Sequence, residues 1–152
     1  MERSRTAAEL GEVLYELFVT VVRRLSRELS LTARSALTTL ERCGPMRLGE
    51  LAASEAVTQP SMTATVDQLC RLGLATRLPD PRDGRVVLVS LTSEGARHLD
   101  QRRADLADWI AAAIDQLPDG EATAATRALP ALRHLVDGIA ATSPKPTPPD
   151  KL

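Results

Sequence analysis

The stretch that decides the fold runs from Val57 to Gly95 and reads VTQPSMTATVDQLCRLGLATRLPDPRDGRVVLVSLTSEG. Its first part has apolar residues at helical spacing, and Gly73 ends that pattern. The period then changes, because residues 74–78 and 85–91 have strand character and are joined by a segment dense in Pro, Asp and Gly. The pattern predicts a helix followed by a β-hairpin with arginines on its loop.

A short helix over residues 48–54 is expected just before this stretch, with a turn at residues 55–57. Val57 would fill the turn, and the Thr58 hydroxyl would cap the next helix. Two helices joined in this way form a helix-turn-helix. We therefore expect a mainly α protein with a small β-hairpin wing, that is, a winged helix-turn-helix with a helical dimerisation region.

The second helix of this unit has an apolar side and a short, polar, uncharged side toward its N-terminus. Such side chains can approach base edges in the major groove, although a solvated helix face is the alternative. Arginines on a projecting loop can enter a minor groove, where an ordinary charged hairpin is again the alternative. The two features in succession favour a DNA reader. Within the helix, Asp67 is expected to pair with Arg71, four residues on.

The motif GLATR…DPRDGR…VSLTSEG resembles the signature of the MarR (multiple antibiotic resistance regulator) family of bacterial winged-helix repressors, and the resemblance extends over about residues 7–141. It implies major-groove contacts from Thr58, Gln59, Ser61, Thr63, Ala64 and Gln68. It places Arg85 at the wing tip, with Arg77 and Asp83 bracing the wing; Arg82 on the same loop is also expected at the DNA. Family members often carry arginine where this chain has Ala64 and Gln68, so we expect fewer DNA contacts and a shallower salt dependence.

The flanking helices have apolar stripes too wide for one small winged-helix core, which would leave residues such as Leu99 uncovered in a monomer. A two-fold dimer covers them. We expect a dimerisation helix over residues 1–30, the DNA-binding domain over 31–92, dimerisation helices over 93–141 and a disordered Pro-rich tail over 142–152. The expected dimer contacts are Leu10, Leu14, Leu106, Trp109, Ile110, Ile114, Leu132 and Val136. The DNA partner is then a pseudo-palindromic operator in double-stranded DNA, with half-sites ~34–36 Å apart.

The family resemblance also implies a sequence-specific transcriptional repressor that a small aromatic or anionic effector releases from DNA, but no ligand-binding residues can be assigned. Arg77 and Met62 are candidates for the border of such a cleft. Two alternatives stay open. One is a redox-sensing regulator that uses Cys70 or Cys43, and the other is a winged helix that contacts protein.

The 152 residues carry a net charge of −1 and 43% hydrophobic residues, a balance typical of one soluble domain with an appendage. No apolar run reaches the ~20 residues that span a membrane, and the N-terminus has no signal-peptide core, so we expect a cytoplasmic protein. The two cysteines form no CxxC pair, which argues against a metal site. No nucleophile–base pair, paired carboxylates or phosphate loop is evident. We expect neither an enzyme nor a cofactor.

Overall fold

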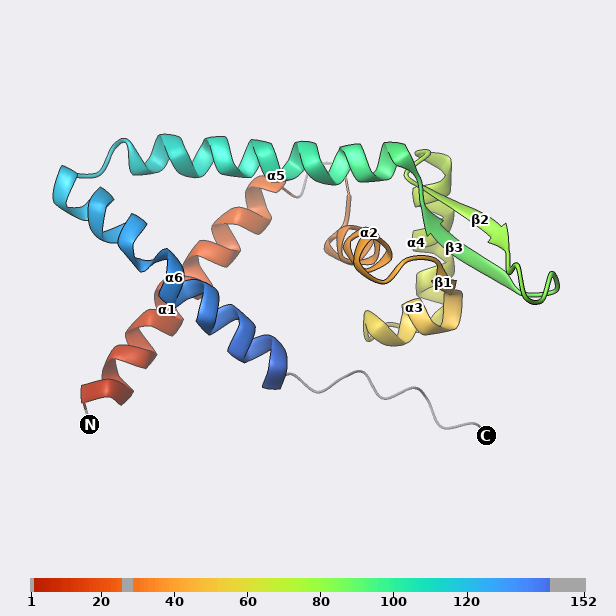
Figure 1. Cartoon of the computed structure of the whole chain (residues 1–152), viewed down its shortest axis with the longest axis horizontal. Coiled ribbons are helices and arrows are strands. Elements are labelled where there is room, and N and C mark those ends of the chain that lie inside the picture. Colours follow the sequence, from red (N-terminus) through yellow and green to blue (C-terminus); the bar gives the residue numbers. More distant parts are fainter. Residues whose placement is uncertain (1, 26–28, 143–152) are drawn as a thin grey trace.

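The computed structural model describes residues 2–25 and 29–142 and is mainly helical, with a small sheet at one end (Figure 1). Its elements, in chain order, are α1 (Glu2–Leu25), α2 (Leu31–Cys43), β1 (Met46–Arg47), α3 (Leu48–Ser54), α4 (Gln59–Arg71), β2 (Ala75–Pro79), β3 (Val87–Leu91), α5 (Ser93–Ile114) and α6 (Asp119–Thr142). The long α5 connects the end that holds the sheet, α2, α3 and α4 to the end where α6 begins (Figure 1). The predicted fold class is confirmed.

Hydroxyl side chains cap the first turn of three of these helices, among them the predicted cap at Thr58. Ser30 caps α2 by accepting from the amide of Ala33 at 3.1 Å. Thr92 caps α5 by accepting from the amide of Gly95 at 2.9 Å. Thr58 caps α4, and Gly73 follows that helix with a φ of 72°, a left-handed conformation that favours glycine. These local signals fix where the central helices begin and end.

The sheet has three strands, in the order β1-β3-β2, where the sequence predicted only a hairpin. β2 and β3 pair antiparallel from Ala75↔Leu91 to Pro79↔Val87. The strands lie at residues 75–79 and 87–91 and not at 74–78 and 85–91, so Arg85 belongs to the connecting loop. β1 is too short to leave a periodic signal, and it pairs through Met46↔Val89.

A single apolar core joins α2, α3, α4 and the sheet. Its largest fully buried side chains are Leu37, Leu40, Leu51, Met62, Val66, Leu69 and Val89. Leu99 of α5 is also buried in this core, which corrects its assignment to the dimer-forming stripe. Met62 is buried as well and does not border an open cleft. The first part of α5 is therefore packed into the winged-helix unit.

The outer helices have the following ends. α1 is described from Glu2 to Leu25; of the rest of the expected helix over residues 1–30, residues 26–28 lie outside the described residues and Ser30 caps α2. α5 ends at Ile114. α6 begins at Asp119, and Pro130 lies inside it. Apart from residue 142, which ends α6, the predicted disordered tail lies outside the described residues.

Candidate nucleic-acid interface

α3 and α4 form the predicted helix-turn-helix, and the turn between them is tightly bonded. Ala56 adopts a positive φ of 52°, and the amide of Val57 donates to the carbonyl of Ala52 at 3.1 Å. The half-buried Val57 packs against the core, as expected. From α2, the buried Thr39 hydroxyl donates to a carboxylate oxygen of Glu55 at 2.7 Å. The angle between the two helices is thus set by a filled turn and by a side chain from a third helix.

α4 presents a buried side and an outward side that match the sequence prediction. Met62, Val66 and Leu69 are buried. The residues predicted to lie at DNA occupy the other side, where Thr58, Gln59, Ser61 and Ala64 are exposed and Thr63 and Gln68 are half-buried. They belong to one helix and its cap, so the fold brings this group together.

The loop between β2 and β3 is held by two aspartates that bond to its backbone. Asp80 accepts from the amide of Arg82 at 2.8 Å, and Asp83 accepts from the amide of Arg85 at 3.1 Å. Asp83, which the family resemblance implies braces the wing, thus bonds to the Arg85 backbone and not to its side chain. Arg82 and Arg85 are both exposed. Two guanidinium groups are therefore carried on a loop whose backbone is fixed in place.

Arg77 of β2 pairs with Asp67 of α4 through a 2.7 Å bond between its Nη2 atom and the Asp67 Oδ1 atom. The predicted Asp67–Arg71 pair is therefore wrong, because the hairpin folds back and brings Arg77 to the carboxylate. Both side chains are about 40% exposed, at 39% for Arg77 and 43% for Asp67. The contact joins the wing to the second helix of the helix-turn-helix.

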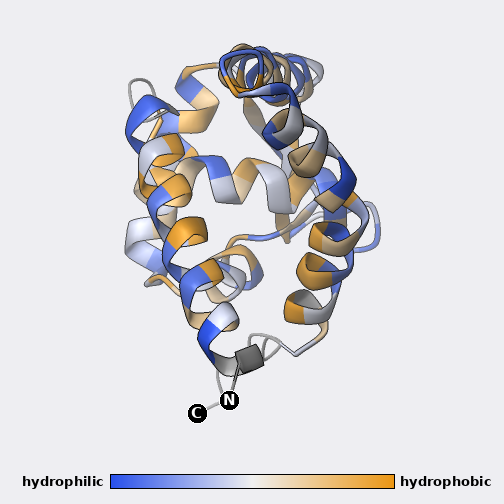
Figure 2. Cartoon of the chain, turned by 90° about the vertical axis from the view of Figure 1, so that its left-hand side faces the viewer, coloured by the Kyte–Doolittle hydropathy of each residue, from blue (hydrophilic) through white to orange (hydrophobic). Residues whose placement is uncertain are grey.

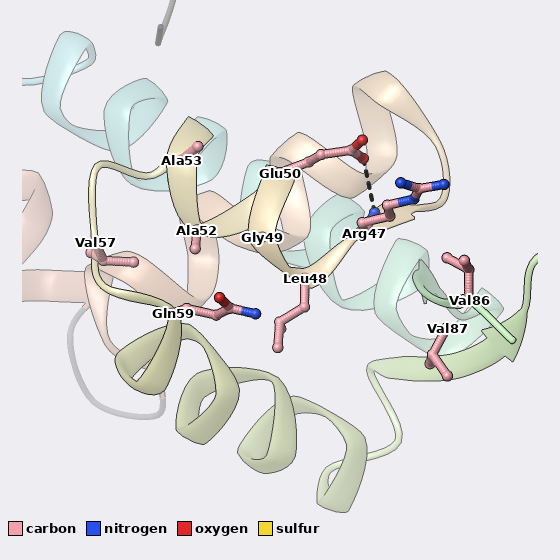
Figure 3. Close-up of a pocket in the computed structure, with 10 residues that line it drawn as sticks. All are labelled: Arg47, Leu48, Gly49, Glu50, Ala52, Ala53, Val57, Gln59, Val86 and Val87. Carbon is pink, nitrogen blue, oxygen red and sulfur yellow. Dashed lines mark hydrogen bonds between the residues drawn. The ribbon is translucent and has the colours of Figure 1, made fainter. Parts of the chain in front are cut away.

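A hollow of about 770 Å³ lies between α3, the first residue of α4 and the start of β3 (Figure 3). Leu48, Val57 and Val87 give it an apolar lining, and Gln59 lies at its edge (Figure 3). At another edge, the Glu50 carboxylate accepts from the amide of Arg47 at 3.0 Å and caps α3. The wing is therefore separated from α3 by an open space.

The far end of the molecule exposes a large apolar surface on α1 and α6. The two helices lie apart from each other in this view, and each carries hydrophobic segments along its length (Figure 2). Phe18 is 54% exposed and Val136 is 62% exposed. Of the residues predicted to form a dimer, Leu10, Leu14, Ile110 and Val136 are exposed, and Leu106, Trp109, Ile114 and Leu132 are half-buried. One chain does not cover this surface.

A second hollow, of about 830 Å³, lies between the last turns of α1 and the middle of α5. Its lining includes Arg23, Arg24, Arg102 and Trp109 together with two carboxylates, Asp105 and Asp108, and Arg102 pairs with Asp105 at 3.6 Å. The Arg24 guanidinium lies over the Trp109 ring, 5.2 Å from its centroid, which is a cation–π arrangement. Sequence reasoning did not find this group because it depends on how α1 and α5 meet.

The two cysteines occupy different environments. Cys43 is exposed at the end of α2, and Cys70 is half-buried against the core. Within residues 2–25 and 29–142, no group of three or more His, Cys, Asp or Glu residues could hold a metal ion. No helix in the described ranges is long and apolar enough to cross a membrane.

Comparisons with known proteins agree with this architecture. The model of the MarR family matches residues 29–87. An HTH-type transcriptional regulator of Mycobacterium bovis is 38% identical over 125 residues, which cover 76% of this chain and 87% of that protein. One from Mycobacterium leprae is 41% identical over 98 residues, which cover 59% of this chain and 68% of that protein.

Solved structures give the same result for the fold. A transcriptional regulator of Thermotoga maritima superposes with a TM-score of 0.75 at 21% identity, over 90% of this chain and 99% of the other. A MarR family protein of Bacillus stearothermophilus gives a TM-score of 0.65 at 24% identity, over 88% of this chain and 97% of the other.

The fold, the exposed side of α4 and the arginine-bearing loop between β2 and β3 define a winged helix-turn-helix regulator. More specifically, the chain belongs to the MarR family, as its sequence resemblance suggested. It is a transcriptional regulator of the MarR type with a DNA-binding role and is not an enzyme.

Proposed function

We propose that the protein is a cytoplasmic homodimer that binds a pseudo-palindromic operator in double-stranded DNA, sequence-specifically, and represses transcription until a small molecule releases it. The observation that carries the proposal is that two candidate DNA-binding surfaces lie on neighbouring elements of the same chain. An uncharged polar face on α4 is joined, through Arg77 and Asp67, to a wing with two exposed arginines. Within the homodimer, residues 31–92 would bind DNA and residues 1–30 and 93–141 would form the dimer, with the first part of α5 also packed against the DNA-binding unit through Leu99.

In this proposal, α4 enters the major groove. Its contacts come from Thr58, Gln59, Ser61, Thr63, Ala64 and Gln68. Arg85 enters the minor groove and Arg82 lies near the backbone, where negative potential attracts guanidinium groups. Asp83 holds the loop backbone, and Arg77 positions the wing through Asp67. The wing thus supplies the positive charge that α4 lacks.

Fluorescence anisotropy with the DNA upstream of the gene for this protein, across a salt series, tests the proposal. Arg85→Ala should weaken binding about tenfold, because the loss of an arginine contact to a base costs about 1–3 kcal/mol of binding free energy. Arg127→Ala removes the same charge from α6 and should leave affinity almost unchanged. If the unmodified protein binds this DNA no better than a random duplex at low salt, the result would contradict the proposal and favour the alternative of a wing that contacts protein.

The exposed apolar faces of α1 and α6 support the dimer. Val136→Glu should convert the dimer to monomer in sedimentation velocity, because a carboxylate would be buried without a partner. Val87→Glu makes the same change at an exposed wing position and should leave the dimer intact. A monomeric unmodified protein at micromolar concentration would rule out this assembly.

The hollow lined by Arg23, Arg24, Arg102 and Trp109 supports an anionic aromatic effector. Guanidinium groups bind carboxylates and an indole ring can stack on an aromatic ligand, so an effector would replace the contact of Arg102 with Asp105 and that of Arg24 with Trp109 by its own. An effector between α1 and α5 would contact α5, the helix that connects the proposed dimerisation region to the winged-helix unit. Isothermal titration with salicylate or benzoate should show binding that Trp109→Leu weakens, whereas unchanged binding would place the effector elsewhere.

A further inference from the structure

The outward face of α4 has an unusual chemical composition, from which the bases that it reads can be inferred. We propose that the half-site in contact with α4 consists of A·T pairs and requires no guanine there. Gln59 and Gln68 would bind adenine, and Ala64 with its threonine neighbours would contact thymine methyl groups. This inference rests on the proposed function, since it assumes that α4 lies in the major groove.

The first argument is the absence of a guanine-reading side chain. In the major groove, guanine presents two acceptors, O6 and N7, which arginine or lysine reads with paired donors. α4 carries a single basic residue, Arg71, in its last turn. In a helix-turn-helix the N-terminal residues of the recognition helix reach the bases, and Arg71 is the last residue of α4, almost one turn beyond Gln68. Gln59 and Gln68 have the donor and acceptor that match adenine N7 and N6.

The second argument concerns the only acid on α4. A free carboxylate can accept a hydrogen bond from cytosine N4, which would allow a G·C pair to be read from its other strand. The Asp67 carboxylate instead accepts from Arg77 at 2.7 Å. Its charge is balanced by the wing arginine. The part of α4 before Asp67 therefore carries no charged side chain that could read a G·C pair, and the Asp67 carboxylate is paired, so only hydroxyl and amide oxygens remain as acceptors for cytosine N4.

The third argument is the apolar character of the flanks. The Thr63 hydroxyl donates to the carbonyl of Gln59 at 2.9 Å, and the Thr65 hydroxyl donates to the carbonyl of Ser61 at 3.0 Å. With these donors occupied within the helix, the threonines contribute methyl groups and accepting lone pairs that suit adenine N6 or cytosine N4 equally. Ala64, exposed between them, adds a third methyl group. Thymine is the base with a methyl group in the major groove.

Selection from duplexes with two-fold symmetric random half-sites, using the full chain, tests the inference. The enriched half-sites should hold consecutive A·T pairs, and changing one central pair to G·C should weaken binding about tenfold. Enriched sites with a required G·C pair at the centre of the half-site would overturn the inference and leave the DNA-binding proposal standing. No enrichment of any sequence would overturn both.

Two changes identify the contacts directly. Replacing thymine by uracil removes only the C5 methyl group, and at the position facing Ala64 it should weaken binding severalfold. Gln68→Arg should change the preferred base at one position from adenine to guanine. Gln116→Arg makes the same substitution near the end of α5 and should leave the preferred sequence unchanged. Full insensitivity to uracil at every position of the half-site, or an unchanged preference in Gln68→Arg, would contradict the assignment.

Discussion

Arg77 of β2, on the wing, and Asp67 of α4 form a hydrogen-bonded ion pair, with 2.7 Å between Nη2 and Oδ1. The hairpin follows α4 after only a short turn around Gly73, where the amide of Leu74 donates to the carbonyl of Leu69 at 2.9 Å. The side-chain pair adds a second connection, farther along the strand. The orientation of the wing relative to α4 is therefore fixed at two points.

Breaking this pair with Asp67→Asn distinguishes two roles for Arg77, because the two roles predict opposite changes in operator affinity. If Arg77 positions the wing, Asp67→Asn should weaken operator binding about three- to tenfold in an anisotropy titration. If Arg77 instead contacts DNA directly, the same change should strengthen binding, because it removes a negative charge and releases a cation toward the phosphates. The free energy of unfolding should fall by only about 0.2–1 kcal/mol, as for other exposed pairs.

The matched control for that substitution is Glu94→Gln. Glu94 pairs with Arg97 on the exposed surface of α5, so the change also breaks an ion pair and removes one negative charge. Operator affinity should stay within about twofold of the unmodified protein. The exchanged pair Asp67→Arg with Arg77→Asp should bind more tightly than Asp67→Arg alone, whereas a simple charge effect would favour the single variant, which carries more positive charge.

Gly95 lies where α5 crosses the start of β2, and no larger residue fits there. A Cβ atom at this position would lie 2.1 Å from the carbonyl oxygen of Leu74 and 2.6 Å from Cδ1 of Leu91. Gly95→Ala should therefore lower the free energy of unfolding by about 1–3 kcal/mol. Gly120→Ala, at a helical position with no atom within 4 Å, should leave stability equal or slightly higher. Urea denaturation followed by circular dichroism compares them, and equal midpoints would contradict the close approach.

Ala56 stores strain in the turn of the helix-turn-helix, since its φ of 52° is left-handed. A left-handed L-residue costs about 1–2 kcal/mol, and glycine loses about 0.5–1 kcal/mol of entropy on folding. Ala56→Gly should therefore stabilise the protein by about 0.5–1 kcal/mol. Ala53→Gly, in the helix just before, should destabilise it by a similar amount. Thermal melts that move in the same direction for both variants would contradict the assigned strain.

The sequence predicted most reliably the features that depend on neighbouring residues. The Thr58 cap and the Gly73 helix end follow from hydrogen-bonding and backbone preferences within a few residues. The apolar and polar sides of α4 followed from the 3.6-residue period, and the individual residues expected at DNA followed from the family resemblance. These features comprise the helix-turn-helix and most of the proposed reading face.

Features set by distant contacts were missed or assigned wrongly. β1 has two residues and exists because Met46 pairs with Val89. The partner of Asp67 was placed at Arg71 by the four-residue rule, whereas the fold brings Arg77 closer. Leu99 fits the apolar stripe of α5, but a stripe does not say which core covers it. In each case the decisive neighbour is absent from the local sequence.

The last prediction concerns the contact between the reading domain and α5. Arg103 of α5 donates from Nη1 to Glu41 Oε1 of α2 at 3.0 Å and forms a second bond to the other carboxylate oxygen. The hydrogen bonds from Arg103 lower the pKa of Glu41 below its usual value of 4.5. Since the folded pKa is lowered, the pair stabilises the protein above pH 4.5 and its contribution is lost as pH falls through the folded pKa.

Arg103→Ala should return the pKa of Glu41 toward 4.5 in a titration of its side-chain carboxyl carbon by NMR. Asp100→Asn removes the other carboxylate that Arg103 contacts, at 3.0 Å, and should leave the pKa of Glu41 low. This control separates a bond to Glu41 from a general change in charge around α5. If the pKa of Glu41 in Arg103→Ala is the same as in the unmodified protein, the pair does not hold α2 to α5 in solution.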